Sequence, residues 1–262
     1  MKRLLALVLA GASWIPGLQA DEQAAQTTDA AAATGDEMID AAAMQALDRM
    51  GAYLRTLETF SVRAEDRIDE VLDSGQKIQL SARIDLQVRR PDRLHADIET
   101  DRRSREIYFN GKAFTLVAPT LGYYTSVPAP ATIGEMLSMI ETKYDVSFPL
   151  VDLFHWGTDP DAAAAINSAI VLGTSKIGGN MTDHYAFRQE GVDWQIWIAQ
   201  GEAPLPLRYV ITTMDEPEQP QYSADLTWDT QAEPADSTFT FTPTDKHHPI
   251  AIVVLDEAQA AN

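Results

Sequence analysis

The sequence predicts an α+β fold in which a single curved antiparallel β-sheet carries helices on one face. Three observations lead to this prediction. Long segments alternate apolar and polar residues with a period of two, as strands do when one face is buried. Helical periodicity is restricted to the start and the middle of the chain, so the layout is helix, strands, helices, strands. No linker-like segment divides the middle, which favours one folded domain.

The N-terminus has the parts of a secretory signal peptide. Lys2 and Arg3 precede a short apolar run, Pro16-Gly17 ends it, and Ala20 supplies a small residue for cleavage. The run is shorter than the roughly 20 apolar residues that span a bilayer. We therefore expect a signal peptide over residues 1–20, a flexible leader over 21–36, a half-barrel domain over 37–256 and a tail over 257–262.

The absence of cysteine indicates the compartment. The sequence contains no Cys, so it forms no disulfide and has no Cys to carry a lipid after the signal peptide. An exported chain of this size without disulfides fits the periplasm of a Gram-negative bacterium better than an extracellular fluid. No second apolar run has membrane-spanning length, so we expect no integral membrane segment after signal cleavage.

Three segments have helical patterns. From Glu37, apolar residues recur at steps of three and four until about residue 58, which predicts one apolar helix face. Residues 133–143 place Met136, Leu137 and Ile140 on one face of a second helix. A third helix is expected over 162–168, after the helix-opening sequence Asp159-Pro160-Asp161.

Two strands before residue 90 have the clearest alternation. Residues 60–72 and 78–89 each carry apolar side chains on one face, and Asp73-Ser74-Gly75 forms the turn between them. The turn at Arg90-Pro91-Asp92 follows, and we expect Arg90 and Arg93 to be solvated or to pair with acids near a strand end. Shorter strands are expected at 93–100, 106–109, 113–117, 123–127, 169–177, 183–189, 194–198, 207–214, 221–228, 238–241 and 250–255.

The later strands place large apolar side chains on one side of the sheet. Trp194, Ile196 and Ile198 share a face, and Tyr209 and Ile211 continue it on the next strand. Asp193 and Gln195 fall at strand-end and outer-face positions, where structural contacts are expected rather than catalysis. The inner residues form either a core that the helices cover completely or an apolar concavity that they cover in part, and periodicity fits both.

The sequence does not favour catalysis, a metal or a cofactor. The five histidines have no spacing typical of a zinc site. Ser74 and Lys77 match the S-x-x-K string, but they lie in a turn and not on the helix that this chemistry needs. Carboxylates are abundant, yet the pairs Asp159 with Asp161 and Asp183 with Asp193 are expected in solvated loops. No catalytic residue, metal ligand or cofactor is therefore assigned.

The net charge argues against nucleic acid as a partner. The formal charge is −19 at pH 7, and removal of residues 1–20 makes the chain more acidic because Lys2 and Arg3 are lost with no acid. Such a surface repels phosphate backbones. Solubility alone accounts for the charge.

Several segments resemble a family of predicted periplasmic bacterial proteins defined as a domain of unknown function. They are LETFSVRAEDRIDEVLDSGQKIQ from Leu57, VRRPDRL from Val88, DHYAFRQEGVDWQIWI from Asp183 and PLPLRYVIT from Pro204. The resemblance extends from about Ala41 to Val254. That family is similar to the LolA/LolB-like group, which implies a curved half-barrel with helices in its concave face. Relatives of that fold carry lipoprotein acyl chains or other lipids through the periplasm.

The expected function is therefore a periplasmic carrier that binds a lipid, an acyl chain or another hydrophobic ligand. The helices at 37–58 and 133–143 would form a movable plug. The alternatives are a non-enzymatic envelope protein that docks a protein partner on a sheet edge, and a hydrolase, which a buried acid pair would favour. The expected residues of the hydrophobic cavity are Trp194, Ile196, Ile198, Tyr209, Ile211, Leu80, Ile84, Leu86, Met136 and Ile140.

Overall fold

A computed structural model describes residues 39–156 and 160–252. The predicted signal peptide, the whole predicted leader and the C-terminal tail lie outside the described residues. The helices are α1 (Ala41–Thr56), α2 (Ile133–Tyr144), α3 (Asp152–His155), α4 (Pro160–Ala164) and the 3₁₀ helix η1 (Asp236–Phe239). The strands are β1 (Thr59–Val71), β2 (Lys77–Arg89), β3 (Arg93–Thr100), β4 (Ser104–Phe109), β5 (Ala113–Ala118), β6 (Tyr123–Pro128), β7 (Ser168–Ile177), β8 (Asn180–Gln189), β9 (Val192–Ala199), β10 (Pro206–Thr213), β11 (Gln221–Asp229) and β12 (His248–Pro249). No described helix is long and apolar enough to cross a membrane.

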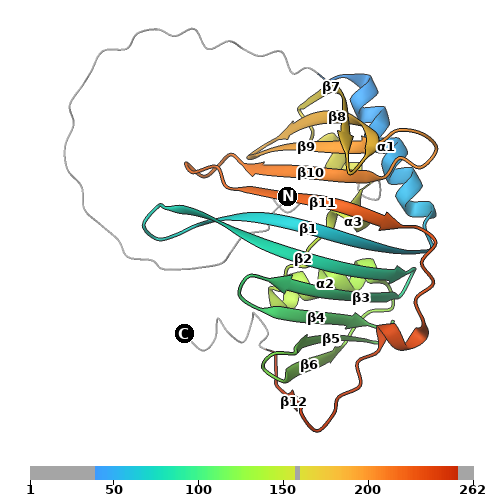
Figure 1. The fold of residues 1–262 in the computed structure, drawn as a ribbon, viewed down its shortest axis with the longest axis vertical. Coiled ribbons are helices and arrows are strands. Elements are labelled where there is room, and N and C mark those ends of the chain that lie inside the picture. The colour runs from blue at the N-terminus through green and yellow to red at the C-terminus, as the bar shows by residue number, and fades with distance from the viewer. Residues whose placement is uncertain (1–38, 157–159, 253–262) are drawn as a thin grey trace, which may run out of the picture.

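All of these strands belong to one open sheet, in the order β12-β6-β5-β4-β3-β2-β1-β11-β10-β9-β8-β7. Figure 1 shows the strands stacked in this order, with β1 and β11 joining the first and second meanders. Every described pairing between neighbouring strands is antiparallel, except the short pairing of β12 with β6. The sheet is curved, and the predicted fold class is confirmed.

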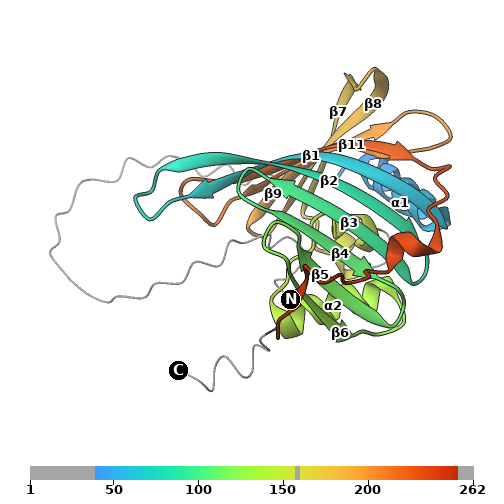
Figure 2. The same ribbon diagram turned by 60° about the horizontal axis from the view of Figure 1, so that its bottom comes forward.

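The helices pack on the concave side of this sheet. Figure 2 shows α1 and α2 on the same side of the strands. Met50 and Leu54 of α1, and Met136 and Ile140 of α2, belong to one buried cluster with the inward side chains of the sheet. Removal of this apolar surface from water is the main stabilising contribution to the fold.

The two long helices begin at residues that cap them. Asp40 accepts a hydrogen bond from the backbone N–H of Ala42 at 2.8 Å at the start of α1. Thr132 and Glu135 form a capping box at the start of α2, where the Thr132 hydroxyl accepts from Glu135 N–H at 3.3 Å and donates to the Glu135 carboxylate at 2.8 Å. These caps fix where the helices begin.

Three of the sequence-based elements are wrong in position or type. Residues 238–241 are not a strand, because residues 236–239 form η1, which packs near β3 and buries Phe239. The third helix covers Pro160–Ala164 and not 162–168, since Ser168 already pairs with Arg188 in the sheet. The last strand is β12 at residues 248–249, just before the strand expected at 250–255. Residues 253–255 of that expected strand lie outside the described residues.

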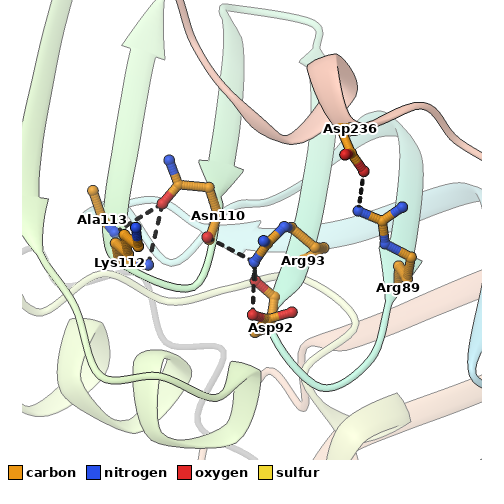
Figure 3. Close-up of polar contacts among 7 residues, drawn as sticks. All are labelled: Arg89, Asp92, Arg93, Asn110, Lys112, Ala113 and Asp236. Carbon is orange, nitrogen blue, oxygen red and sulfur yellow. Dashed lines mark hydrogen bonds and ion pairs between the residues drawn. The ribbon is translucent and has the colours of Figure 1, made fainter.

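The RRPDRL segment (Arg89–Leu94) holds three parts of the fold together at the β2–β3 turn (Figure 3). Arg89 pairs with Asp236 of η1. Arg93 pairs with Asp92 at 2.7 Å and donates to the Asn110 carbonyl of the β4–β5 turn at 2.7 Å. Of the two alternatives for Arg93, solvation or pairing with an acid, the structure shows the pairing.

Arg90 differs from that expectation, because it faces inward. Its guanidinium lies 5.9 Å from the ring centre of Phe60 and 5.5 Å from that of Phe154 in α3. Burial lowers the pKa of Arg90 from its ordinary value. The segment therefore positions α3 on the inner face, and the carbonyl of Pro91 accepts from the first N–H of α2 at 2.9 Å.

Candidate functional site

The strand register places the predicted cavity residues of the sheet on its inner face. Trp194 faces Ile211 across β9 and β10, and Ile196 faces Tyr209. On the other side of β1, Ile84 faces Ala64 and Leu86 faces Val62, whose side chains point the same way. The face assignment that underlies the predicted site therefore agrees with the register.

Burial divides those ten residues into two groups. Leu80 and Ile211 are half-buried, near the end of the sheet that carries the β1–β2 turn. The others are buried in the core cluster that the sheet forms with the helices. They are Ile84, Leu86, Met136, Ile140, Trp194, Ile196, Ile198 and Tyr209. Most of the predicted cavity is thus filled by the protein's own side chains.

Exposure on the inner face rises toward the β1–β2 turn. Along β1 the inward residues change from buried Ala64 and Asp66 to half-buried Ile68. Leu80 faces Ile68 on β2, Ile98 faces Ile84 on β3, and Ile211 lies on β10. We call the four half-buried residues Ile68, Leu80, Ile98 and Ile211 the inner rim. Figure 1 shows the β1–β2 hairpin extending beyond the helices at this end of the sheet.

The boundary of the inner rim contains a buried polar network. Asp66 is only 3% exposed, and its Oδ2 accepts a hydrogen bond from the Tyr222 hydroxyl at 2.6 Å. The Tyr209 hydroxyl lies 3.5 Å from that of Tyr222 and donates to it. Asp66 Oδ1 is buried and has no hydrogen-bond partner among the residues that the structure describes.

A second carboxyl reaches the same network from α3. Burial raises the pKa of Asp152 to about 7, and its charge is among the causes that raise the pKa of Tyr209. Burial likewise raises the pKa of Asp66 to about 7, against the opposing effect of the Tyr222 hydrogen bond. Trp156 packs edge-on against Tyr209, with ring centres 5.6 Å apart. Asp66, Tyr222 and Tyr209 therefore form a hydrogen-bonded network, and Asp152 acts on Tyr209 through its charge.

Small residues surround Asp66 in the sheet. Ala82 faces it on β2 and Ala224 faces it on β11. Ala64 precedes it on the same face of β1. Because these side chains are methyl groups, the groups that bury the carboxyl of Asp66 come from other positions.

Reasoning from the sequence did not single out Asp66, Tyr222 or Asp152. The available signal for Asp66 was its position, because the alternation of β1 puts residue 66 on the inward face between Ala64 and Ile68. Asp152 likewise interrupts the apolar segment from Pro149 to Trp156. An acid at an inward position is the kind of residue that indicates a site.

The outer face of β8 and β9 carries structural contacts, as expected for Asp193 and Gln195. Asp193 forms a two-point ion pair with Arg188, both distances being 2.6 Å. Gln195 hydrogen-bonds His184 at 3.1 Å, and the His184 ring stacks on Trp197 with centres 3.9 Å apart. Within the described part of the chain no group of His, Cys, Asp or Glu could hold a metal ion.

A family model matches residues 43–253, and its description is "Predicted periplasmic protein (DUF2092)". The chain belongs to this family. The resemblance inferred from the RRPDRL and VDWQIWI segments is therefore confirmed. Comparison with curated proteins gives no match.

Solved structures with distant similarity include two mycobacterial proteins. Lipoprotein LppX of Mycobacterium tuberculosis is 15% identical, with a TM-score of 0.49, over 74% of this chain and 99% of that one. LprF of Mycobacterium bovis is 13% identical, with a TM-score of 0.45, over 80% and 99%. The LolA superfamily protein NE2245 of Nitrosomonas europaea is 12% identical, with a TM-score of 0.38, over 76% and 97%.

Proposed function

We propose that this DUF2092 protein is a periplasmic carrier that binds a lipid, an acyl chain or another hydrophobic ligand on the concave face of its sheet. The inner rim is the observation that supports the proposal. Ile68, Leu80 and Ile98 are large apolar side chains that the helices leave partly exposed. Burial of such a side chain by a ligand contributes roughly 1.5–3 kcal/mol.

The helices supply a plug that a ligand could displace. Met50 and Met136 are fully buried against the sheet, and Met44 and Met139 pack at the edge of the same cluster. Methionine side chains are flexible and adapt to irregular surfaces. A ligand that enters over the inner rim would reach the covered part of the concave face as this plug moves.

Binding of a neutral fluorophore, N-phenyl-1-naphthylamine, tests the proposal. The folded protein, purified from periplasm without detergent, should enhance its fluorescence saturably. Leu80→Gln and Ile211→Gln should each weaken the fluorophore about tenfold, because each replaces an apolar surface on the inner rim. Mass spectrometry of a solvent extract of the untreated protein would identify the class of a co-purified lipid.

The matched control is Leu172→Gln. Leu172 is 52% exposed on β7, the edge strand at the far end of the strand order from β6 and β12. This change should leave the affinity within about twofold, as for surface substitutions generally. A well-folded wild-type protein that binds no fluorophore and yields no lipid would contradict the carrier function.

A protein partner at the β7 edge is a second candidate, supported by a separate observation. Val171 and Leu172 are exposed there, next to the bulge at Gly173, and Ile39 bridges to Ala169 beside them. An unpaired edge can accept a strand from another chain. A Val171→Lys variant that loses a crosslinked envelope partner, while Leu80→Gln keeps it, would favour this function over the carrier.

The buried acids Asp66 and Asp152 bear on the hydrolase alternative, since raised pKa values are typical of general acids. Hydrolysis of p-nitrophenyl esters tests it. We expect no turnover above that of the Asp66→Asn variant, because the residues that flank Asp66 in the sheet are alanines and supply no nucleophile.

A further inference from the structure

Asp66 has a hydrogen-bonding requirement that the described fold leaves unmet. Its Oδ2 is satisfied by Tyr222 at 2.6 Å, whereas Oδ1 is buried and unpaired among the described residues. An ionised Oδ1 lacks a donor, and a protonated Oδ1 lacks an acceptor. An unsatisfied buried polar atom costs about 1–3 kcal/mol. A hydroxyl group can meet either requirement, because it both donates and accepts.

Asp66 lies where the end of a bound chain would be. Ile68, two residues further along β1, belongs to the inner rim, and its side chain points to the same face. Ala82 and Ala224 flank Asp66 on the neighbouring strands, so no large side chain from these two positions covers the carboxyl within the sheet. An apolar chain that lies on Ile68 and Leu80 therefore approaches Asp66 with its end.

The local charge selects against an anionic end. The charges of Glu65 and Asp225 raise the pKa of Asp66, so negative charge already surrounds this position. A carboxylate or phosphate placed there would be repelled by these acids, and by Asp66 in its ionised form. A neutral hydroxyl meets no such repulsion.

We propose that Asp66, supported by Tyr222, binds a hydroxyl group at the end of the hydrophobic ligand. The ligand class is thus a neutral, hydroxyl-bearing lipid, such as a long-chain alcohol or an acylglycerol. This inference rests on the proposed carrier function and names the ligand class of the same site. Tyr222 is a positioning residue, because its hydroxyl fixes the Asp66 carboxyl through Oδ2.

A matched pair of probes tests the assignment: 1-dodecanol and its methyl ether, each displacing N-phenyl-1-naphthylamine from the full chain. The two probes share the alkyl chain, but the ether has no hydroxyl to donate. At pH 8, where the Asp66 carboxyl is ionised and can only accept, the wild type should bind the alcohol about tenfold more tightly, as expected for one hydrogen bond to a buried carboxyl. Asp66→Leu should remove this preference, so that it binds the alcohol and the ether with equal affinity.

Tyr222→Phe should reduce the preference to about threefold, because Asp66 keeps its place but loses one fixed contact. The control Asp73→Asn, in the exposed β1–β2 turn, should keep the full preference. Equal affinities for alcohol and ether in the wild type would overturn the inference even if Asp66→Leu fails to fold. If the wild type still binds the fluorophore in that case, the carrier function stands. If the wild type binds no fluorophore, both the carrier function and the hydroxyl-binding role of Asp66 are contradicted.

Discussion

Asp66 shows how one inward residue links stability to the site. In the folded chain burial holds its pKa at about 7, whereas its ordinary value is 3.8. Between these two pH values the folded chain keeps a proton that the unfolded chain has lost. The free energy of unfolding therefore falls as pH rises through this window, and Asp66 is most favourable to folding below it.

The Asp66→Asn variant should lack this fall in the free energy of unfolding with rising pH. Asn stays neutral, so at pH 8 the variant should be more stable than the wild type, by on the order of 2 kcal/mol. At pH 4 the two proteins should differ little, since the wild-type carboxyl is protonated there. Urea unfolding at the two pH values measures the difference.

A control variant shows whether the pH-dependent difference in the free energy of unfolding comes from the buried carboxyl. Asp73→Asn, at the exposed turn, should change the free energy of unfolding by less than about 0.5 kcal/mol at both pH values. If Asp66→Asn is as destabilising at pH 8 as at pH 4, the carboxyl is not held neutral by burial, and the account of its pKa is wrong.

At the scale of elements, the β4–β5 turn shows what the RRPDRL segment requires of its neighbours. Gly111 has a φ of +79°, and a Cβ there would lie 2.6 Å from Asp92 Oδ2 and 2.7 Å from Arg93 Nη1. The turn therefore needs glycine both for its backbone conformation and for the approach of Arg93 to the Asn110 carbonyl. Figure 3 shows Arg93 directed at that carbonyl.

Two glycine-to-alanine changes should have opposite signs. Gly111→Ala should destabilise the fold by about 1–3 kcal/mol, from a strained φ and displacement of Arg93. Gly134→Ala should stabilise it by about 0.5–1 kcal/mol, because Gly134 lies in α2 with open space around its Cα. Thermal unfolding of both variants checks this. Equal effects would mean that the clash at the turn is absorbed by movement of Asp92.

The helices and strands whose apolar periodicity is contained in their own sequence could be predicted. The alternation of residues 78–89 corresponds to β2, and the steps of three and four from Met44 correspond to α1. The segment at 238–241 failed because Phe239 and Phe241 have strand-like spacing, yet Phe239 is buried from a 3₁₀ turn and Phe241 packs on Tyr108 and Tyr124. Its structure depends on those distant partners, which a local pattern does not contain.

At the scale of the whole molecule, periodicity left open whether the helices cover the inner face completely or in part, and the structure shows both situations. Inward residues such as Trp194 and Ile196 are covered by helices, as in an ordinary core, while Leu80 and Ile211 are not. The sequence could assign these residues to one face because the strand period fixes it. It could not say where the helices stop, since that depends on how far the β1–β2 hairpin extends past them (Figure 1).

Hydrogen exchange on the whole chain should reveal whether the helices act as a plug. A carrier that admits a long chain must move α1 and α2, because Met50 and Met136 fill the space between helices and sheet. We expect saturating 1-dodecanol to speed amide exchange in residues 41–56 and 133–144, and to slow it in the strands that carry the inner rim. Slower exchange in those strands with unchanged helices would place the ligand on the inner rim alone and contradict the plug. Such a result would limit the ligand to the short surface between Ile98 and Asp66. The affinity for alkyl alcohols would then stop rising once the alkyl chain is longer than this surface.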